Sequence, residues 1–543
     1  MSGPAFRASS TPASRLIPAL GILALAPFAV FANVTAVTAI EEQIGAHLHS
    51  SPSALTLIVN ITSIATAPLI LLSGHLGDRY GRKRIYLIGS LIFALASFLC
   101  AAAGSTGLLI VARGFQGIGA GILTALSLSL IATLLGPERR GLAIGAWSSG
   151  VGLGLAVGPL LGAALTGGAG WRWLFVVIGA ATLVVWAGSL IATGEIKPVI
   201  DGRWSFDIAG TITSIAGVAA ISVGATYAST WGWSSARTIV LLVSGVALFG
   251  LFALAERRAA VPLVRINAFS VPSYSVVAAI TLINLVVVIG MFVFTGLSLA
   301  VNLGKSGVTD GLMFLPFSAL LLLLSAAFGR LLDRVGPRPM LIGVEVAGAA
   351  GLFYLAAVVV TANPTYGALV PGLVLVGLSA AAGGPTTAST LVHGQPSTRI
   401  AEGASINGTL VQLGSAIGSG IVAGAFGANF AHHLVAQVSS LGLGPAKTGA
   451  ALGALAHHQP PSGLSPAELG QVIGATHLAF GHTLQGVLIG LGVLSVIALV
   501  ISFRVRLDEI RTAASVTHDA LTEAAAAGVT GSGDAMPRPG LVG

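Results

Sequence analysis

Charged residues are scarce in this sequence. Asp, Glu, Lys and Arg make up 8% of its 543 residues, against roughly a quarter in an ordinary soluble domain. With 18 acidic and 26 basic residues, the chain has too few charges to cover a water-facing surface of its size, and 55% of its residues are hydrophobic. The composition therefore excludes an ordinary soluble protein and indicates an integral membrane protein.

Cysteine and nucleotide-binding motifs are also nearly absent. Cys100 is the single cysteine, which excludes an intramolecular disulfide and a cysteine-cluster metal site. No phosphate-binding P-loop is present, so we expect no ATP-driven transport by this chain, no enzyme activity and no cofactor. The formal charge of +8 arises from short basic clusters between apolar runs, not from a basic stripe with interleaved aromatics. We therefore expect no nucleic-acid partner.

Long apolar runs dominate what is present. A run of about 20 apolar residues crosses a bilayer as one helix, and only helices and closed barrels satisfy their backbone polar groups there. Because the runs have helix length, we predict an all-α polytopic membrane protein that contacts the lipid bilayer through about fourteen spans, at 16–40, 53–76, 85–104, 107–135, 141–166, 172–193, 207–228, 237–256, 273–303, 309–332, 339–361, 366–391, 402–434 and 481–503.

The distribution of Lys and Arg between the loops predicts the orientation. With the N-terminus inside, 21 basic residues fall on the cytoplasmic side, Arg113 lies within a span, and four fall outside, namely Arg172, Arg237, Lys305 and Lys447. Basic residues favour cytoplasmic loops. We therefore predict a multi-pass protein of the cell (plasma or inner) membrane with both termini in the cytoplasm. The histidines gather on the outer side without the spacing of a closed metal site, so we expect no metal.

Two loops at corresponding places share one pattern. Residues 74–84 read GHLGDRYGRKR, and residues 329–338 read GRLLDRVGPR. Each loop has Gly, then Asp-Arg four and five residues later, then Gly two residues further on. One loop follows the second of the first six spans, and the other follows the second of the last six. This repeat indicates two six-helix halves of the kind found in transporters that bind their substrate between the halves.

The repeat also predicts the domain organisation. We expect a cytoplasmic N-terminal tail at 1–15, a six-helix bundle at 16–193, a cytoplasmic linker at 194–206, two inserted helices at 207–256, a second linker at 257–272, a second six-helix bundle at 273–503 with an outer loop at 435–480, and a partly disordered cytoplasmic tail at 504–543. Within the outer loop, Ser465-Pro466-Ala467-Glu468 is a capping box and predicts a short helix that leads into the last span.

The first repeated loop resembles motif A of the major facilitator superfamily, through Gly74, Asp78, Arg79, Gly81 and Arg82. Residues 112–119, which include Arg113 and Gln116, resemble the family's arginine motif. The fifth span resembles motif C, which marks antiporter branches, at Gly150, Gly154, Gly158, Pro159 and Gly162. Further segments are similar to those of the fourteen-helix drug:proton antiporters, at 137–141, 171–175, 311–316 and 407–414. The resemblance covers residues 16–503 and implies the major facilitator fold, with two six-helix bundles and two extra central helices.

Each motif has a functional and a structural interpretation. The resemblance implies that Asp78 and its neighbours, with Asp333 and Arg334 of the second loop, latch the two halves together on the cytoplasmic side. The alternative is that these basic residues only set topology and contact anionic lipid. For Arg113 the resemblance implies proton coupling, and the alternative is a structural tie between helices. The motif C glycines recur every four residues, and close helix packing alone would explain them.

The sequence departs from the family where coupling residues are usual. Ala32 stands at the usual aspartate of the first helix, Ala300 at the usual glutamine of the ninth, and Val411 at the arginine that usually precedes Gln412; the usual Asn-x-Pro is missing from residues 177–180. Two acids are candidates to replace the missing aspartate. Glu345 lies about seven residues inside a span, where an acid is a functional candidate by default, although it can also snorkel or pair with a loop base. Asp310 lies near the outer mouth, where pairing with Lys305 is the alternative.

Amide side chains are the candidate substrate contacts in an otherwise apolar cavity, although amides also hold helices together. They are Asn33, Gln116, Asn284, Asn302, Asn407 and Gln412. We predict a monomeric secondary transporter that exports hydrophobic or amphiphilic small molecules, such as drugs or antibiotics, by proton antiport and alternating access. The alternatives are an exporter of lipids or lipid-like metabolites on the same fold, an uptake symporter, and a non-transporting membrane receptor or scaffold.

Overall fold

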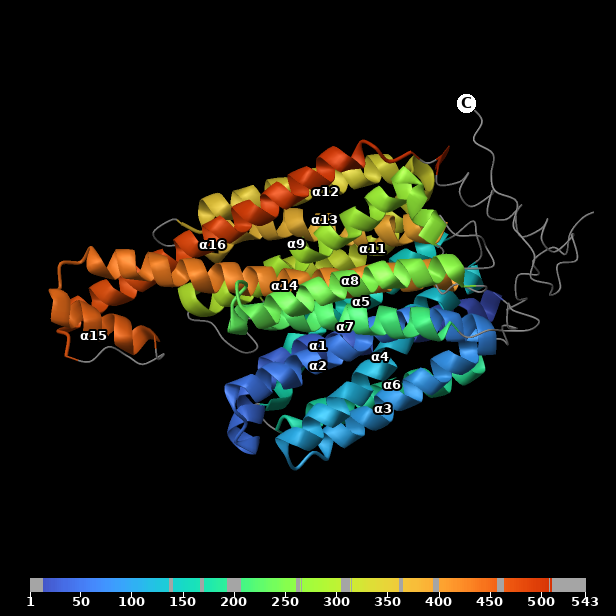
Figure 1. The fold of residues 1–543 in the computed structure, drawn as a ribbon, viewed down its shortest axis with the longest axis horizontal. Helices are drawn as coiled ribbons and strands as arrows, with labels where there is room; N and C mark the ends of the chain where they lie inside the picture. The colour runs from blue at the N-terminus through green and yellow to red at the C-terminus, as the bar shows by residue number, and fades with distance from the viewer. Residues whose placement is uncertain are drawn as a thin grey trace, which may run out of the picture.

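The computed structural model describes residues 13–135, 140–166, 170–192, 207–259, 264, 266–303, 313, 315–360, 365–393, 400–456, 463–506 and 508–509. Within these ranges the chain is a bundle of long, roughly parallel helices without a strand (Figure 1). The all-α prediction is therefore confirmed for the part of the chain that the structure describes.

Six helices form the N-terminal part of the bundle: α1 (Ala13–Leu48), α2 (Pro52–Tyr80), α3 (Arg82–Ala101), α4 (Thr106–Leu135), α5 (Arg140–Thr166) and α6 (Arg172–Ala192). Local sequence sets their ends. The Ser51 side chain accepts a hydrogen bond from the backbone of Ala54 and caps α2, and Pro52 occupies its first turn. Gly81 has a φ of 95°, a conformation that favours glycine, and this residue separates α2 from α3.

The remaining elements are α7 (Ile208–Trp231), α8 (Ala236–Arg258), the short η2 (Ile266–Ser270), α9 (Pro272–Leu303), α11 (Leu315–Val335), α12 (Pro337–Val358), α13 (Tyr366–His393), α14 (Ile400–Ser439), α15 (Pro445–Ala456) and α16 (Pro466–Ser502). Each of the fourteen predicted spans overlaps one long helix. Within the described ranges, 12 helices are long and apolar enough to cross a membrane, and α2 adds a shorter apolar stretch at Leu57–Ile70. The predicted count of fourteen is consistent with this arrangement.

The two sets of six helices meet along two seams. α5 packs against α11 at one seam, and α2 packs against α14 at the other. Glycines make the first seam tight, since a Cβ on Gly145 would lie 2.7 Å from the carbonyl oxygen of Ser325. The inserted α7 contacts both α2 and α14, and α8 packs on α7 (Figure 1). The inserted hairpin therefore lies over the second seam.

The two sets are also in contact at the end that carries the repeated loops. The hydrophobic core of the first six helices includes Ile131 near the end of α4 and Ile144 near the start of α5. Ala388 and Val392 of α13 and Ala404 of α14 belong to the same buried cluster. Hydrophobic contacts thus join the two sets at this end.

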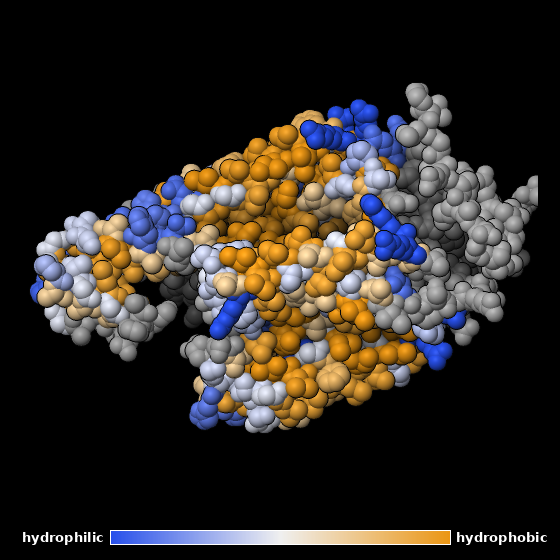
Figure 2. Space-filling model, viewed as in Figure 1, coloured by the Kyte–Doolittle hydropathy of each residue, from blue (hydrophilic) through white to orange (hydrophobic). Residues whose placement is uncertain are grey.

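An arm extends from the opposite end of the bundle. α14 and α16 have 40 and 37 residues, which correspond to about 60 Å and 55 Å of helix, well beyond the roughly 30 Å of a hydrocarbon core. With α15 they enclose a small apolar core of their own, which includes Leu434, Val438, Ala451, Val472 and Ala475. Figure 2 shows apolar residues over the bundle and a more polar surface over the arm.

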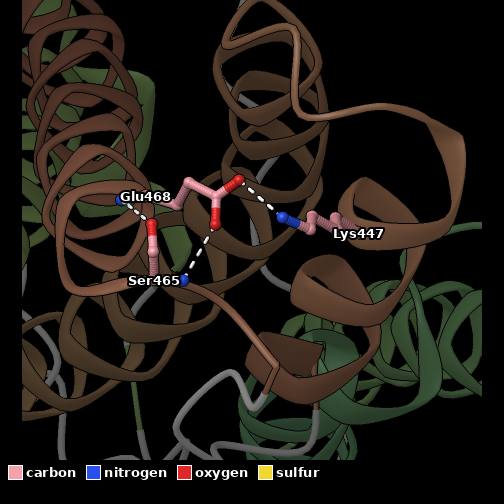
Figure 3. Close-up of polar contacts among 3 residues, drawn as sticks. All are labelled: Lys447, Ser465 and Glu468. Carbon is pink, nitrogen blue, oxygen red and sulfur yellow. Dashed lines mark hydrogen bonds and ion pairs between the residues drawn. The ribbon is translucent and has the colours of Figure 1, made fainter.

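The predicted capping box lies in this arm and is confirmed. The Ser465 side chain accepts from the backbone of Glu468, and the Glu468 carboxylate accepts from the Ser465 amide at 2.8 Å and from Lys447 Nζ at 2.7 Å (Figure 3). The helix that starts here is longer than expected. It continues without interruption into the last span, because no proline follows Pro466 within α16.

Candidate transport site

A buried arginine organises the first six helices. Arg113 on α4 is 0% exposed. Its Nε donates to the carbonyl oxygen of Ile58 at 3.1 Å, one terminal nitrogen donates to that of Val59 at 3.3 Å, and the other donates to Gln116 Oε1 at 2.8 Å. In the described part of the chain, the hydrogen-bond partners of this guanidinium are carbonyl and amide oxygens, not a carboxylate. Arg113 therefore ties α4 to α2.

The network continues through Gln116 to two further helices. Gln116 Nε2 donates to Ser97 Oγ on α3 at 2.8 Å and to Asn33 Oδ1 on α1 at 3.4 Å, and Asn33 Nδ2 donates to Gln116 Oε1 at 3.3 Å. All four side chains are fully buried. Sequence reasoning placed Asn33 and Gln116 in the substrate cavity and did not single out Ser97, whose serine has no motif around it. In this structure the two amides face each other and the guanidinium.

The motif C glycines lie where α5 crosses α1. A Cβ on Gly154 would lie 2.7 Å from the carbonyl oxygen of Phe28 and 2.9 Å from the backbone nitrogen of Ala32. A Cβ on Gly150 would overlap the carbonyl oxygen of Ala24, and one on Gly158 would overlap the Thr35 hydroxyl. Close packing is therefore the role that the structure displays for these three glycines. Gly162 is also buried, and a role of motif C in transport stays a prediction.

Motif A lies at the junction of α2, α3 and α4. Arg82 is 3% exposed, and its guanidinium donates to Thr133 Oγ1 on α4 at 3.1 Å. Gly74 is buried near the end of α2, and Arg79 is half-buried. Asp78 belongs to α2, but its side chain lies outside the described residues. The predicted latch between the two halves therefore stays a prediction.

Both repeated loops have a glycine with a positive φ between two helices. Gly336, between α11 and α12, has a φ of 83°, close to the 95° of Gly81 in the first loop. The side chains of Asp333 and Arg334 are exposed at the end of α11. The repeat is thus matched in local structure, while the charged side chains of the two loops differ in burial.

A buried acid lies in the second set of helices. Glu345 on α12 is 1% exposed, and neither carboxyl oxygen has a hydrogen-bond partner. Asn284 on α9 lies beside this carboxyl group, and its Nδ2 is likewise buried without a partner. Sequence reasoning selected both residues but for separate roles. The fold brings them together across 61 positions of sequence because α9 and α12 contribute to the same buried cluster.

The other predicted contacts are more dispersed. Asn407 on α14 is 3% exposed, and its Oδ1 has no hydrogen-bond partner. Gln412, on the same helix, is half-buried. Asn302 belongs to α9, but its side chain lies outside the described residues, as does all of Asp310. Pro159 is part of α5, and its side chain is likewise outside them.

The fold has two six-helix sets, two matching loops and an inserted hairpin. Comparison with known proteins shows which family has this arrangement. A family model described as Major Facilitator Superfamily matches residues 23–199 and 208–419. The chain belongs to the major facilitator superfamily. Members of this family are transporters of small molecules, so the chain is a membrane-embedded transporter and not an enzyme.

Individual relatives agree with this assignment. The chain is 29% identical over 424 residues to the tetracenomycin C resistance and export protein of Streptomyces glaucescens, covering 76% of this chain and 77% of that protein. It is 30% identical over 418 residues to the methylenomycin A resistance protein of Bacillus subtilis (strain 168), covering 76% and 87% respectively. A solved proton:xylose symporter bound to 6-bromo-6-deoxy-D-glucose has the same fold, with a TM-score of 0.57, 15% identity and coverage of 92% and 99%. The predicted family and fold class are confirmed.

Proposed function

We propose that this transporter exports hydrophobic or amphiphilic small molecules of the drug and antibiotic class in exchange for protons. Two relatives named for antibiotic resistance or export, each matched over about three quarters of this chain, support the substrate class. The buried, unpartnered carboxyl group of Glu345 carries the proposal of proton coupling.

The position of Glu345 explains why it is suited to a proton. It lies eight residues into α12, about 12 Å from the start of the helix. An ionised carboxylate costs several kcal/mol in such a setting unless donors surround it. Binding of one proton converts the carboxylate to a neutral acid and removes that cost. We propose that Glu345 takes this proton from the outer side and releases it to the cytoplasm during each export cycle.

Alternating access requires two halves that part at one end while they meet at the other. We propose that residues 16–193 and 273–503 are these halves and that residues 207–256 form an insert beside them. Contacts of Ala388, Val392 and Ala404 with the N-terminal core support a state closed at the end with the repeated loops. In this proposal Asp78, the neighbouring arginines and the Asp333-Arg334 pair stabilise that closed end.

The charge pattern supports the remaining parts of the proposal. The excess of basic residues on one side of the predicted spans supports a cytoplasmic location for that side and for both chain termini. The chain then acts as a monomer in the cell membrane, and the arm formed by α14, α15 and α16 lies outside the cell.

Transport by purified protein in liposomes tests the function. Vesicles with an acidic lumen should accumulate those compounds of a panel that the protein exports, when its outer face is lumenal. The panel contains antibiotics, neutral and cationic amphiphiles and a fluorescent lipid analogue, so it also separates drug export from lipid export. If no compound enters vesicles that contain the wild-type protein faster than it enters protein-free vesicles, the proposed function is wrong.

Substitution of the acid tests the coupling. Glu345→Gln keeps the size of the side chain but cannot bind or release a proton, so it should abolish accumulation driven by the pH gradient. Glu468→Gln is the matched control, because Glu468 lies in the arm, outside the predicted spans. Gradient-driven accumulation at the wild-type level by Glu345→Gln would remove Glu345 from the mechanism.

A further inference from the structure

A side-chain amide lies beside Glu345 and can hydrogen-bond to its carboxyl group in both the ionised and the protonated state. The side-chain amide of Asn284 lies next to the carboxyl group, yet neither Asn284 Nδ2 nor the carboxyl oxygens have a hydrogen-bond partner. Buried polar atoms are rarely left unpaired in proteins. Unpaired neighbours of complementary chemistry therefore indicate a pair whose bond forms in one state of the protein and not in another.

An amide has the chemistry that such a pair requires. Its nitrogen donates hydrogen bonds and its oxygen accepts them. Asn284 can donate from Nδ2 to the ionised carboxylate, and after rotation of its amide it can accept from the hydroxyl of the protonated acid at Oδ1. A leucine of similar size could do neither.

The helices around Asn284 leave the amide room for this rotation. A Cβ on Gly383 of α13 would lie 3.5 Å from Asn284 Nδ2 and 3.3 Å from Val344 Cγ1, next to Glu345 in sequence. The glycine therefore keeps one side of the amide open. One turn further along α12, a Cβ on Gly348 would lie 2.9 Å from Ser379 Oγ and 3.5 Å from Ser495 Oγ. These two hydroxyls therefore lie about one turn of α12 beyond Glu345.

Apolar residues close this polar level on both sides. Towards the repeated loops lies a buried cluster with Val277, Leu341 and Ala498. Towards the arm lies a second cluster with Leu352 and Leu491. Two apolar clusters thus flank the level of Glu345, and the Asn284 amide lies beside the carboxyl group at that level.

In the described part of the surrounding helices, no other titratable group lies at this level. Along α9, α11, α12, α13 and α16, the remaining titratable or charged side chains lie towards the helix ends or in the arm, and they are Tyr274, Arg330, Asp333, Arg334, Arg338, Tyr354, Tyr366, His393, Glu468, His477 and His482. A local change at Glu345 should thus depend on the polar atoms beside it and not on a second charge.

We propose that Asn284 is the positioning residue for the coupling proton: its amide stabilises the ionised carboxylate of Glu345 by donation and the protonated acid by acceptance. The inference rests on the proposed function, in which Glu345 carries the proton. Because hydrogen bonds to charged groups are stronger than those to neutral ones, loss of the amide disfavours the ionised form more than the protonated form. Release of the proton then requires a more alkaline medium.

The test is the pH profile of transport. Initial rates are measured in liposomes at a constant gradient of about one pH unit while both pH values are raised together. Asn284→Leu should move the midpoint of this profile to alkaline pH, by about one unit for loss of one charge-assisted bond. Asn284→Ser retains a hydroxyl that donates and accepts, so its shift should be smaller.

Matched variants separate positioning from general packing. Gln485→Leu removes another amide, which is half-buried on α16, a helix that packs against α9 and α12, and it should leave the midpoint unchanged. If Asn284→Leu and Asn284→Ser are both inserted in the membrane and both keep the wild-type midpoint, the inference is wrong. If Glu345→Gln loses its gradient dependence while both Asn284 variants keep the wild-type midpoint, the role of Asn284 is refuted and the coupling role of Glu345 stands. Persistence of gradient dependence in Glu345→Gln would refute the coupling itself.

Discussion

The buried arginine of the N-terminal helices and the buried glutamate of the C-terminal helices have opposite surroundings. In the N-terminal half, Arg113 and Gln116 have hydrogen bonds to the carbonyl oxygens of α2 and to side chains on α1 and α3. In the C-terminal half, the carboxyl oxygens of Glu345 and the amide nitrogen of Asn284 are buried without such bonds. A satisfied network stabilises one arrangement, whereas an unsatisfied pair can gain from a change of protonation or packing. We therefore expect the network around Arg113 to stabilise the fold and the Glu345–Asn284 pair to respond to protonation.

The largest expected effect is loss of the amide that joins the N-terminal network. Gln116→Leu removes an acceptor from a buried guanidinium and leaves the Asn33 amide without its hydrogen bonds to Gln116, while Ser97 keeps its bond to the carbonyl oxygen of Phe93. We expect a destabilisation of about 3 kcal/mol, because a bond to a charged group is lost and buried polar atoms stay unpaired. The apparent melting temperature of the purified protein should fall clearly, while the same change at half-buried Gln412 should have little effect. Equal melting of the two variants would contradict a structural role for the network.

A methyl group at the α1–α5 crossing should have the next largest effect. Gly154→Ala places a Cβ 2.7 Å from the carbonyl oxygen of Phe28, a backbone atom that cannot move alone. We expect about 1–3 kcal/mol of destabilisation from overpacking and a lower yield of folded protein. Thermal unfolding monitored by tryptophan fluorescence measures this. A variant as stable as the wild type would show that the two helices are less close than described.

Neutralising Glu345 should change the stability of the protein in the opposite direction. Glu345→Gln replaces an unpartnered carboxyl group by a neutral amide of similar size, so the variant should be as stable as the wild type or more stable by about 1 kcal/mol. Because the ionised carboxylate is the costly form, the advantage should increase as the pH rises. Melting temperatures of the two proteins, compared from about pH 5 to about pH 9, measure this difference in stability. A destabilised variant would mean that Glu345 has a structural partner.

The smallest expected change in stability comes from adding a methyl group at Gly383, in the C-terminal helices. Gly383→Ala meets its nearest atoms at 3.3 Å and 3.5 Å, and both belong to side chains. The gain in helix propensity, about 0.5–1 kcal/mol, should offset the crowding, so stability stays near that of the wild type. The same transport assay should show a lower rate, since the Asn284 amide loses room to rotate. An unchanged rate together with unchanged stability would argue against that rotation.

Much of the architecture could be predicted because its causes are local. Apolar runs of helix length, the turn glycines Gly81 and Gly336, and the Ser465–Glu468 capping box each act within a few residues, and the structure has a helix or helix end at each of them. The family resemblance was equally visible, since motif A is one contiguous segment. The length of α14 and α16 was missed because spans were delimited by hydropathy, which does not show where a helix leaves the membrane.

The pairing of residues within the site could not be predicted in the same way. The sequence by itself determined that an intramembrane arginine, an intramembrane glutamate and several amides are present, because the scarcity of polar residues makes each one visible. Only the tertiary structure decided which of them meet. Gln116 and Asn33 are 83 positions apart and share a hydrogen bond, whereas Asn284 and Glu345 are neighbours without one. Such pairings depend on how separate helices pack against one another, and helix packing is set by the summed shape of many side chains that no single motif encodes.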